Sequence, residues 1–342
     1  MTGPRAVVVT TLRNEGAFLL EWVAHHRALG FAGILAYSND CEDGTDAMLD
    51  RLAAMGGLAH RRNPGPHPRG PQWAALRAAD RDPVAQEADW VLVADIDEFP
   101  VVHAGEGRLH DLLAAVPGAD AIALTWRMFG NDGQAAFRDA PVTETFLRCA
   151  PAVLHWPWRA QMIKTLFRRD GAYARLGVHR PRDPAPGAAP RWVDGSGEPL
   201  PDAFRAARLF TDPGRDPHRL AQMNHYALGS AEAFVVKCDR GRANRAAPAF
   251  DLGYWADRNF SAVEDRSILR LAPARRAIEA ELRADPVLGA LHRAAVDWRR
   301  ARFRALMREE PWRALYGQLR MLPPSRVLDR DEAQAILRAQ VG

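Results

Sequence analysis

Three carboxylates stand together at the end of an apolar run in this chain of 342 residues. Asp95, Asp97 and Glu98 fall within four positions, directly after the run WVLVA at 90–94. Charged groups at the end of a buried strand cost free energy unless something uses them. Two carboxylates separated by one residue offer hard oxygen ligands for Mg²⁺ or Mn²⁺ and leave positions open for phosphate oxygens. A helix cap or a surface acid cluster is the alternative interpretation of the same spacing.

An alternation of strands and helices must position these acids. Apolar runs predict strands at 6–12, 33–38, 58–62, 90–95 and 121–126, and helical patterns at 15–30, 43–57, 72–80 and 109–116 lie between them. This order is typical of an α/β fold with a mainly parallel sheet covered on both faces. Ligands of such sheets bind at the carboxyl ends of the strands, so Thr10, Asn39 and Asp95 should face one crevice.

The remaining chain is less regular. The segment 180–201 contains six prolines and three glycines, which predicts a mobile loop, and the pattern after residue 213 predicts helices to the end of the chain. We expect two domains, a transferase-like unit at 1–228 with halves at 1–130 and 131–228, and a helical extension at 229–342.

Bulk composition narrows the class of protein. The chain is 47% hydrophobic and 26% charged, as in an ordinary globular protein, and its net charge of +4 is weak evidence for a nucleic-acid partner. The three cysteines, Cys41, Cys149 and Cys238, are odd in number and far apart, which favours reduced thiols over disulfides or a zinc site. The opening residues are too short an apolar stretch for a signal peptide. We therefore expect a cytoplasmic protein.

Four ordered motifs carry a resemblance to a known family. They are Thr11-Leu12-Arg13-Asn14-Glu15, Ser38-Asn39-Asp40, Asp43-Gly44-Thr45 and Asp95-Ile96-Asp97-Glu98-Phe99. Over about the first 130 residues the chain resembles the GT-A glycosyltransferases, in particular the family-2-like bacterial group with a DxDEF motif. The resemblance implies a GT-A type fold with a Rossmann-like nucleotide-binding half.

The resemblance also implies roles for residues of the nucleotide and metal sites. Asp97 would coordinate Mn²⁺ or Mg²⁺ directly, and Asp95 would reach the metal or the ribose through a direct or water-mediated contact. The late His225, in NHY, is similar to the metal-ligand histidine of this group and is favoured over His179. The nucleotide pocket would be lined by Thr10, Arg13 and Glu15. The base would form a hydrogen bond with Asn39 or Asp40.

Candidates for proton transfer and phosphate binding are less distinct. Asp132, in the turn NDG, is a candidate general base or an ordinary turn residue, and Glu98 competes for the role. Lys164 is either a phosphate-neutralising group or a solvated lysine at a strand edge. A basic cluster could bind the diphosphate or an anionic acceptor, or simply be a solvated helix face; it comprises Lys237, Arg240, Arg242 and Arg245.

The leading hypothesis is a divalent-metal-dependent glycosyltransferase. It would move a sugar from a nucleoside-diphosphate sugar to a hydroxyl of a glycan or lipid-linked acceptor, with inversion expected from the resemblance and a place in bacterial cell-envelope polysaccharide synthesis. A phosphohydrolase of the haloacid dehalogenase type is a second hypothesis, but its nucleophilic Asp belongs to the first strand and this DxD follows the fourth. A non-catalytic nucleotide or glycan binder on the same fold is the third.

A basic amphipathic helix is predicted from Leu288 onward. Apolar side chains and Arg302 share one stripe, while Arg299 and further arginines occupy the other faces. The helix could contact an anionic bilayer peripherally at the inner membrane face. The alternative is that the stripe packs on the core, with Arg302 paired to an acid there.

Overall fold

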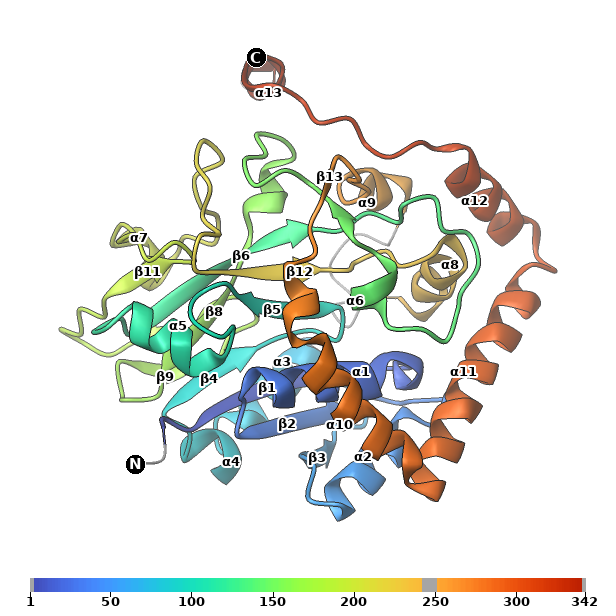
Figure 1. Cartoon of the computed structure of the whole chain (residues 1–342), viewed down its shortest axis with the longest axis horizontal. Coiled ribbons are helices and arrows are strands. Elements are labelled where there is room, and N and C mark those ends of the chain that lie inside the picture. Colours follow the sequence, from blue (N-terminus) through green and yellow to red (C-terminus); the bar gives the residue numbers. More distant parts are fainter. Residues whose placement is uncertain (1–2, 242–250, 340–342) are drawn as a thin grey trace.

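A nine-stranded sheet forms the centre of the computed structural model, which describes residues 3–241 and 251–339 (Figure 1). The strand order is β3-β2-β1-β4-β8-β6-β12-β5, with β11 paired to β6. The strands are β1 (Ala6–Leu12), β2 (Gly33–Ser38), β3 (Ala59–Arg62), β4 (Trp90–Val93), β5 (Glu98–Val102), β6 (Ala121–Met128), β8 (Ile163–Arg168), β11 (Trp192–Asp194) and β12 (Ala221–His225). Two-stranded pairs join β7 (Arg148–Cys149) to β13 (Val263–Glu264), and β9 (Tyr173–Arg175) to β10 (Arg182–Pro184).

Parallel pairing dominates the sheet. Strands β3, β2, β1 and β4 are parallel neighbours, and β6 is parallel to both β11 and β12. Strand β8 is antiparallel to β4 and β6, and β5 is antiparallel to β12. The predicted α/β class with a mainly parallel central sheet is confirmed. The carboxyl ends of β1, β2 and β4 lie at one edge, as the sequence predicted.

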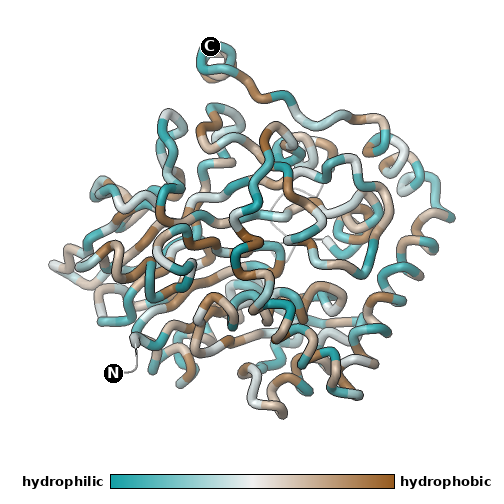
Figure 2. The backbone as a smooth tube through the Cα atoms, in the orientation of Figure 1, coloured by the Kyte–Doolittle hydropathy of each residue, from teal (hydrophilic) through white to brown (hydrophobic). Residues whose placement is uncertain are grey.

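Helices cover both faces of this sheet. The first half carries α1 (Gly16–Leu29), α2 (Thr45–Ala54), α3 (Pro71–Ala79), α4 (Pro83–Gln86) and α5 (Leu109–Ala115). Because side chains alternate along a strand, Ala6 and Val8 of β1 enter one apolar core while Val7 and Val9 enter the other. Figure 2 shows hydrophobic residues along the central strands and many hydrophilic ones on the outer helices.

Two expectations for the second half are wrong. The segment 180–201 contains β10 and β11, and the buried residues of β11 extend the central sheet beside β6. The chain after residue 213 is not helical throughout, because β12 lies inside the sheet between β6 and β5. In β12, AQMNH, the apolar Ala221 and Met223 alternate with Gln222 and Asn224 over only five residues, and these two polar side chains are buried by pairing with one another and with Asp265.

Helices do make up most of the C-terminal region. They are α8 (Ala231–Arg240), α9 (Leu252–Ala256), α10 (Ala272–Ala284), α11 (Pro286–Leu306), α12 (Glu310–Met321) and α13 (Arg330–Ala339); short elements before and among them are α6 (Val142–Thr145), α7 (Ala203–Ala206), η1 (Trp158–Gln161) and η2 (Ser267–Leu271). Helices α10 and α11 lie against α1, and α11 also lies against α2 and α8 (Figure 1).

The apolar stripe of α11 is covered by this packing. Leu288, Ala295 and Leu306 are buried, and Arg302 forms two hydrogen bonds of 2.6 and 2.7 Å with Asp239 of α8. The structure therefore agrees with the packed-helix interpretation. Arg299, expected on an outer face, is instead buried: its guanidinium donates to the Ala233 carbonyl and lies 4.5 Å from the ring centre of Phe18. Within residues 3–241 and 251–339, no helix is long and apolar enough to cross a membrane.

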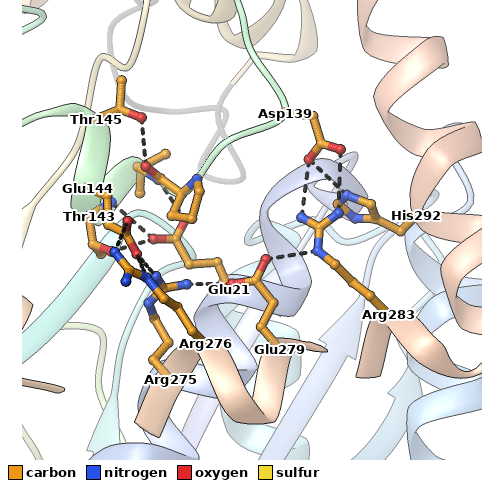
Figure 3. Close-up of polar contacts among 12 residues, drawn as sticks. Glu21, Asp139, Thr143, Glu144, Thr145, Arg275, Arg276, Glu279, Arg283 and His292 are labelled. Atoms are coloured by element: carbon orange, nitrogen blue, oxygen red, sulfur yellow. Dashed lines mark hydrogen bonds and ion pairs between the residues drawn. The ribbon is translucent and has the colours of Figure 1, made fainter. Parts of the chain in front are cut away.

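Ion pairs tie α10 and α11 to the segment 139–145 (Figure 3). The buried Arg275 pairs with Glu144 and Glu279. Further contacts join Glu144 to Arg276 at 2.6 Å, and Asp139 to Arg283 and His292 at 3.2 and 3.0 Å. The C-terminal helices therefore hold the loop that follows β6.

Glu21 of α1 also holds this segment (Figure 3). Its carboxyl group accepts hydrogen bonds from Val142 N at 2.8 Å, Thr143 N at 3.0 Å and Thr143 Oγ1 at 2.6 Å. Burial raises the pKa of Glu21 to about 7, against the effect of these three donors. All three neighbours donate, so the position requires a side chain with two acceptor oxygens.

Glu21→Gln should destabilise the protein. The amide group would turn N–H donors toward backbone N–H donors, which leaves buried polar groups without partners and costs about 1–3 kcal/mol. Urea unfolding followed by circular dichroism measures the loss. Thr143→Val, which removes one hydroxyl and keeps both backbone donors, is the milder control, and an unchanged midpoint for Glu21→Gln would contradict this role.

Candidate functional site

The three acids that follow β4 separate into two groups. Asp95 lies in the turn after β4 and Glu98 begins β5, and both meet Lys164 of β8. Lys164 Nζ lies 3.0 Å from Asp95 Oδ2 and 3.1 Å from Glu98 Oε2. Gln72, at the start of α3, donates to Asp95 Oδ1 at 3.1 Å. Strand β8 thus places the ammonium group of Lys164 next to the turn that carries the acids.

Lys164 is not a solvated lysine at a strand edge. Strand β8 lies inside the sheet between β4 and β6, and the Lys164 side chain is fully buried. Burial would lower the pKa of Lys164, but the charges of Asp95 and Glu98 outweigh this effect and raise it. Lys164 is therefore a permanent buried counter-charge to the two acids.

Glu98 is also sealed from solvent. Its side chain is 0% exposed and accepts from Trp126 Nε1 at 2.7 Å and from Asp95 N at 2.8 Å. Burial raises the pKa of Glu98 to about 8, although Lys164 opposes the shift. These contacts fix the geometry of the turn and leave the Glu98 carboxylate facing the interior.

Asp97 points toward the C-terminal part of the chain. Its Oδ2 lies 2.7 Å from Lys237 Nζ and 3.7 Å from His225 Nε2. Burial would raise the pKa of Asp97, but the charge of Lys237 and the nearby His225 hold it well below its usual value. Of the two aspartates in DxD, Asp97 is therefore the one that meets His225.

The position of His225 follows from the sheet. It ends β12, where it is the antiparallel partner of Glu98, and its ring lies 4.3 Å from that of Trp126. Burial lowers the pKa of His225, which favours the neutral imidazole. The alternative histidine, His179, contacts the Ile163 carbonyl through Nδ1 at 3.1 Å. The preference for His225 over His179 agrees with this geometry.

The chemistry of Asp97 and His225 fits a divalent cation. A carboxylate oxygen and a neutral imidazole are in the protonation states that metal ligands require, and both suit Mn²⁺. Asp95 does not join them, since its oxygens contact Lys164 and Gln72. Across the described ranges, no cluster of three or more His, Cys, Asp or Glu side chains is arranged to hold a metal ion. Further ligands would have to come from phosphate oxygens or water.

The residues after β1 lie at the expected edge. Thr10 is buried, and its hydroxyl has no hydrogen-bond partner within the described residues. Arg13 is partly exposed and lies 3.6 Å from Glu42. Glu15 is buried and paired with Arg240 of α8, which also donates to the Arg13 carbonyl. The basic cluster of α8 therefore reaches the loop between β1 and α1.

The DGT turn fastens this loop. Asp43 Oδ2 accepts from Gly16 N at 2.9 Å, and Asp43 Oδ1 accepts from Thr45 N at 2.9 Å. Thr45 Oγ1 in turn accepts from Glu15 N at 2.9 Å. One aspartate thus satisfies backbone donors at the starts of both α1 and α2. Direct hydrogen bonds therefore link the RNE and DGT motifs.

Asn39 and Asp40 differ in accessibility. Asn39 is buried, donates to the Leu12 carbonyl at 3.2 Å and accepts from Asn63. Asp40 is exposed, has a φ of 45° and accepts from Gly65 N at 3.3 Å. Of the two, Asp40 is the one that a nucleotide base could reach.

The remaining candidates lie away from these contacts or outside the described residues. Asp132 is exposed in the turn after β6, where Arg148 Nε lies 3.9 Å from its Oδ1. Arg242 and Arg245 of the basic cluster lie outside the described residues. Sequence reasoning missed Gln72, Trp126 and Asn63, whose contacts are made only by the folded sheet.

A small pocket, with a volume of about 40 Å³, lies beside Asp97. Glu15, Asp97, Lys237 and Arg299 supply its charged groups. Its other walls are mostly apolar; they include Phe18, Ile96, Val142, Tyr226, Leu228 and Ala233. The open space next to the acid therefore combines an apolar surface with charges of both signs.

Sequence comparison identifies the class of protein as a glycosyltransferase. The family model for glycosyltransferase family 92 matches residues 5–187, more than half of the chain. The chain belongs to glycosyltransferase family 92. The matched range includes β1, α1, the DGT turn, the DxDEF turn and Lys164, and it ends before His225 and Lys237.

Two plant relatives illustrate the similarity. A family 92 protein of Ricinus communis is 33% identical over 97 residues, which are 27% of this chain and 16% of that protein. A family 92 protein of Oryza sativa subsp. japonica is 26% identical over 155 residues, 40% of this chain and 23% of that protein. The aligned parts therefore span less than a quarter of either relative.

Solved structures show a weaker likeness. S. aureus TarS in complex with UDP has a TM-score of 0.32 and 14% identity, covering 48% of this chain and 47% of that one. Glucosyl-3-phosphoglycerate synthase from Mycobacterium tuberculosis, in complex with Mn²⁺, UDP and glucosyl-3-phosphoglycerate, has a TM-score of 0.28 and 15% identity, covering 54% and 62%. At these TM-scores the structural likeness carries no argument about ligands.

Proposed function

We propose that this chain transfers a sugar from a nucleoside-diphosphate sugar to a hydroxyl group of a glycan or lipid-linked acceptor, with inversion at the anomeric carbon and with a divalent cation. The observation that carries the proposal is the meeting of Asp97 with His225 and Lys237 at the carboxyl edge of a family 92 sheet. The phosphohydrolase hypothesis explains neither this constellation nor the family membership, and the family membership favours a transferase over a non-catalytic binder on the same fold.

In this proposal Asp97 and His225 hold Mn²⁺ or Mg²⁺ together with the donor. Bound there, the cation would neutralise charge that develops on the departing diphosphate. Thr10, Arg13 and Glu15 border the nucleotide, Asp40 or Asn39 hydrogen-bonds the base, and Asp95 orients the ribose. Lys164 acts on the donor only indirectly, since its buried ammonium fixes Asp95 and Glu98.

For the acceptor side we propose Asp132 as the general base, with Glu98 as the other candidate. Asp132 is exposed and follows β6, whereas the carboxylate of Glu98 is enclosed by Trp126, Lys164 and the Asp95 backbone. A group that takes a proton from an acceptor hydroxyl must come within hydrogen-bond reach of it. Exposure therefore favours Asp132.

Release of nucleoside diphosphate from a panel of UDP-, GDP- and CDP-sugars, with and without Mn²⁺, tests the proposal. Thermal shift with the same panel would first identify the base, because a ligand that binds only the folded state raises the melting temperature. Release of the nucleoside diphosphate from one of these sugar donors supports a transferase. Stabilisation without release would favour a binder, and release of inorganic phosphate from simple esters would favour a hydrolase.

Asp40→Gly should weaken donor binding about tenfold, the effect of about 1.4 kcal/mol for one lost hydrogen bond to the base. Glycine retains the positive φ of this position and so isolates the loss of the side chain. Titration calorimetry with the nucleoside diphosphate identified by thermal shift measures the change, and Mn²⁺ affinity should be unaffected. Unchanged donor affinity would make Asp40 a turn residue only.

Three further assignments stand as proposals. We keep the boundary at residue 228 between the transferase unit and the helical extension, and the narrower relation to family-2-like bacterial enzymes of cell-envelope polysaccharide synthesis. Peripheral contact with a membrane would have to use a surface other than the apolar stripe of α11, since that stripe packs on the core. Vesicle co-sedimentation at low and high salt tests such contact.

A further inference from the structure

Lys237 occupies the oxygen of Asp97 that a cation would use. Its Nζ lies 2.7 Å from Asp97 Oδ2, and the same oxygen lies 3.7 Å from His225 Nε2. The Lys237 and Asp97 side chains are only 12% and 21% exposed. The carboxylate that binds the metal ion in the proposed function is therefore already paired with an ammonium group.

The fold holds Lys237 in this place. Helix α8 is capped by Ser230, whose hydroxyl accepts from Ala233 N at 3.2 Å, and it packs against α11. Lys237 Nζ also donates to the Ala227 carbonyl at 2.6 Å, two residues beyond His225. Lys237 thus ties the DxD turn to the segment that carries the histidine.

Electrostatics make an ammonium and a divalent cation competitors at one carboxylate. Two cations on the same oxygen repel each other, and the repulsion is strong because the site is shielded from water. The repulsion falls if the ammonium moves away or finds another anion. The diphosphate of a bound donor would be such an anion.

We propose that Lys237 is a built-in competitor of the divalent cation at Asp97, so that the protein without donor binds the cation weakly. The inference rests on the proposed function, because it takes Asp97 and His225 as the ligands. A donor that draws Lys237 to its phosphates would free Asp97, which couples donor binding to cation binding.

This inference is tested by titrating the donor-free full chain with Mn²⁺ alone. The electron paramagnetic resonance signal of free Mn²⁺ measures how much of the ion remains unbound. Lys237→Gln removes the charge while its amide can still donate to the Ala227 carbonyl. It should bind Mn²⁺ about tenfold more tightly than the wild type, a change of about 1.4 kcal/mol. Asp97→Asn should bind Mn²⁺ more weakly than the wild type. Arg302→Gln is the charge-matched control, since it removes a cation paired with Asp239 of α8, and it should leave Mn²⁺ affinity unchanged.

The outcomes separate the inference from the proposed function. Equal Mn²⁺ binding by Asp97→Asn and wild type, together with no gain in affinity for Lys237→Gln, would overturn the metal site itself. A second outcome is that Asp97→Asn binds Mn²⁺ more weakly than the wild type, while Lys237→Gln shows unchanged, weaker or undetectable Mn²⁺ binding. This result would overturn only the competition and leave Lys237 with a structural role. Thermal melting of each variant shows that it is folded, and Lys237→Met replaces the glutamine variant if that one does not fold.

Discussion

Asp97→Asn is expected to lower cation-dependent sugar transfer at least about a hundredfold, since removing one group that stabilises charge in a transition state costs about 10²–10³ in rate. The carboxylate meets both His225 and Lys237 in the structure. The amide keeps the size of the side chain and can still accept from Lys237, so the fold should persist. Transfer rates at several Mn²⁺ concentrations, with circular dichroism as the check on folding, measure the effect.

Asp95→Asn is the matched comparison for that variant. It removes the same charge two residues earlier, but Asp95 contacts Lys164 and Gln72 rather than His225. We expect weaker donor binding with Mn²⁺ affinity close to that of the wild type. Near wild-type transfer by Asp97→Asn at ordinary Mn²⁺ concentrations would remove Asp97 from the metal site.

The first half of the fold could be predicted because its pattern is local. Strands β1, β2 and β4 are continuous apolar runs, and the helices between them have apolar stripes and clear ends, such as Gly30 with a φ of 110° after α1. Parallel strands separated by helices leave few possible arrangements. The edge at which Thr10, Asn39 and Asp95 gather followed from that topology alone.

The second half could not be predicted in the same way. Strand β12 contains Gln222 and Asn224, which read as helical or loop residues in sequence. Their burial is possible because the distant Asp265 accepts from Gln222 and the neighbouring Tyr226 accepts from Asn224. Strand β8 lies in a region without a regular pattern, and its interior place depends on antiparallel pairing with both β4 and β6. Such long-range pairing leaves no periodic signal in one sequence.

The candidate site shows the same division. The sequence identified Asp97 and His225, and the structure brings them together, although they are far apart in the chain. It could not show that Lys237 of α8 would contact Asp97, or that Lys164 would be buried between Asp95 and Glu98. Charge alone does not distinguish a solvated lysine from a buried one, because the difference lies in what the neighbouring strands cover.

Lys164→Met is expected to lower the free energy of unfolding by about 3–5 kcal/mol, the usual cost of removing one partner from a buried ion pair. Glu98 is fully buried, so without Lys164 its carboxylate must either stay charged without a partner or take up a proton. Guanidinium unfolding at neutral pH measures the loss. Because the pKa of Glu98 is about 8 beside Lys164 and higher without it, the deficit relative to wild type should grow as the pH is raised from neutral to about 9.

The double variant Lys164→Met/Glu98→Gln makes that test specific. A neutral glutamine still offers one acceptor oxygen to Trp126 or to the Asp95 backbone, and it removes the unpaired charge. It should therefore recover part of the stability that Lys164→Met loses, so that the two changes are not additive. Equal losses in the single and double variants would mean that Lys164 acts by packing alone. A loss below about 1 kcal/mol in Lys164→Met, the range of a solvent-exposed ion pair, would show that water reaches these acids.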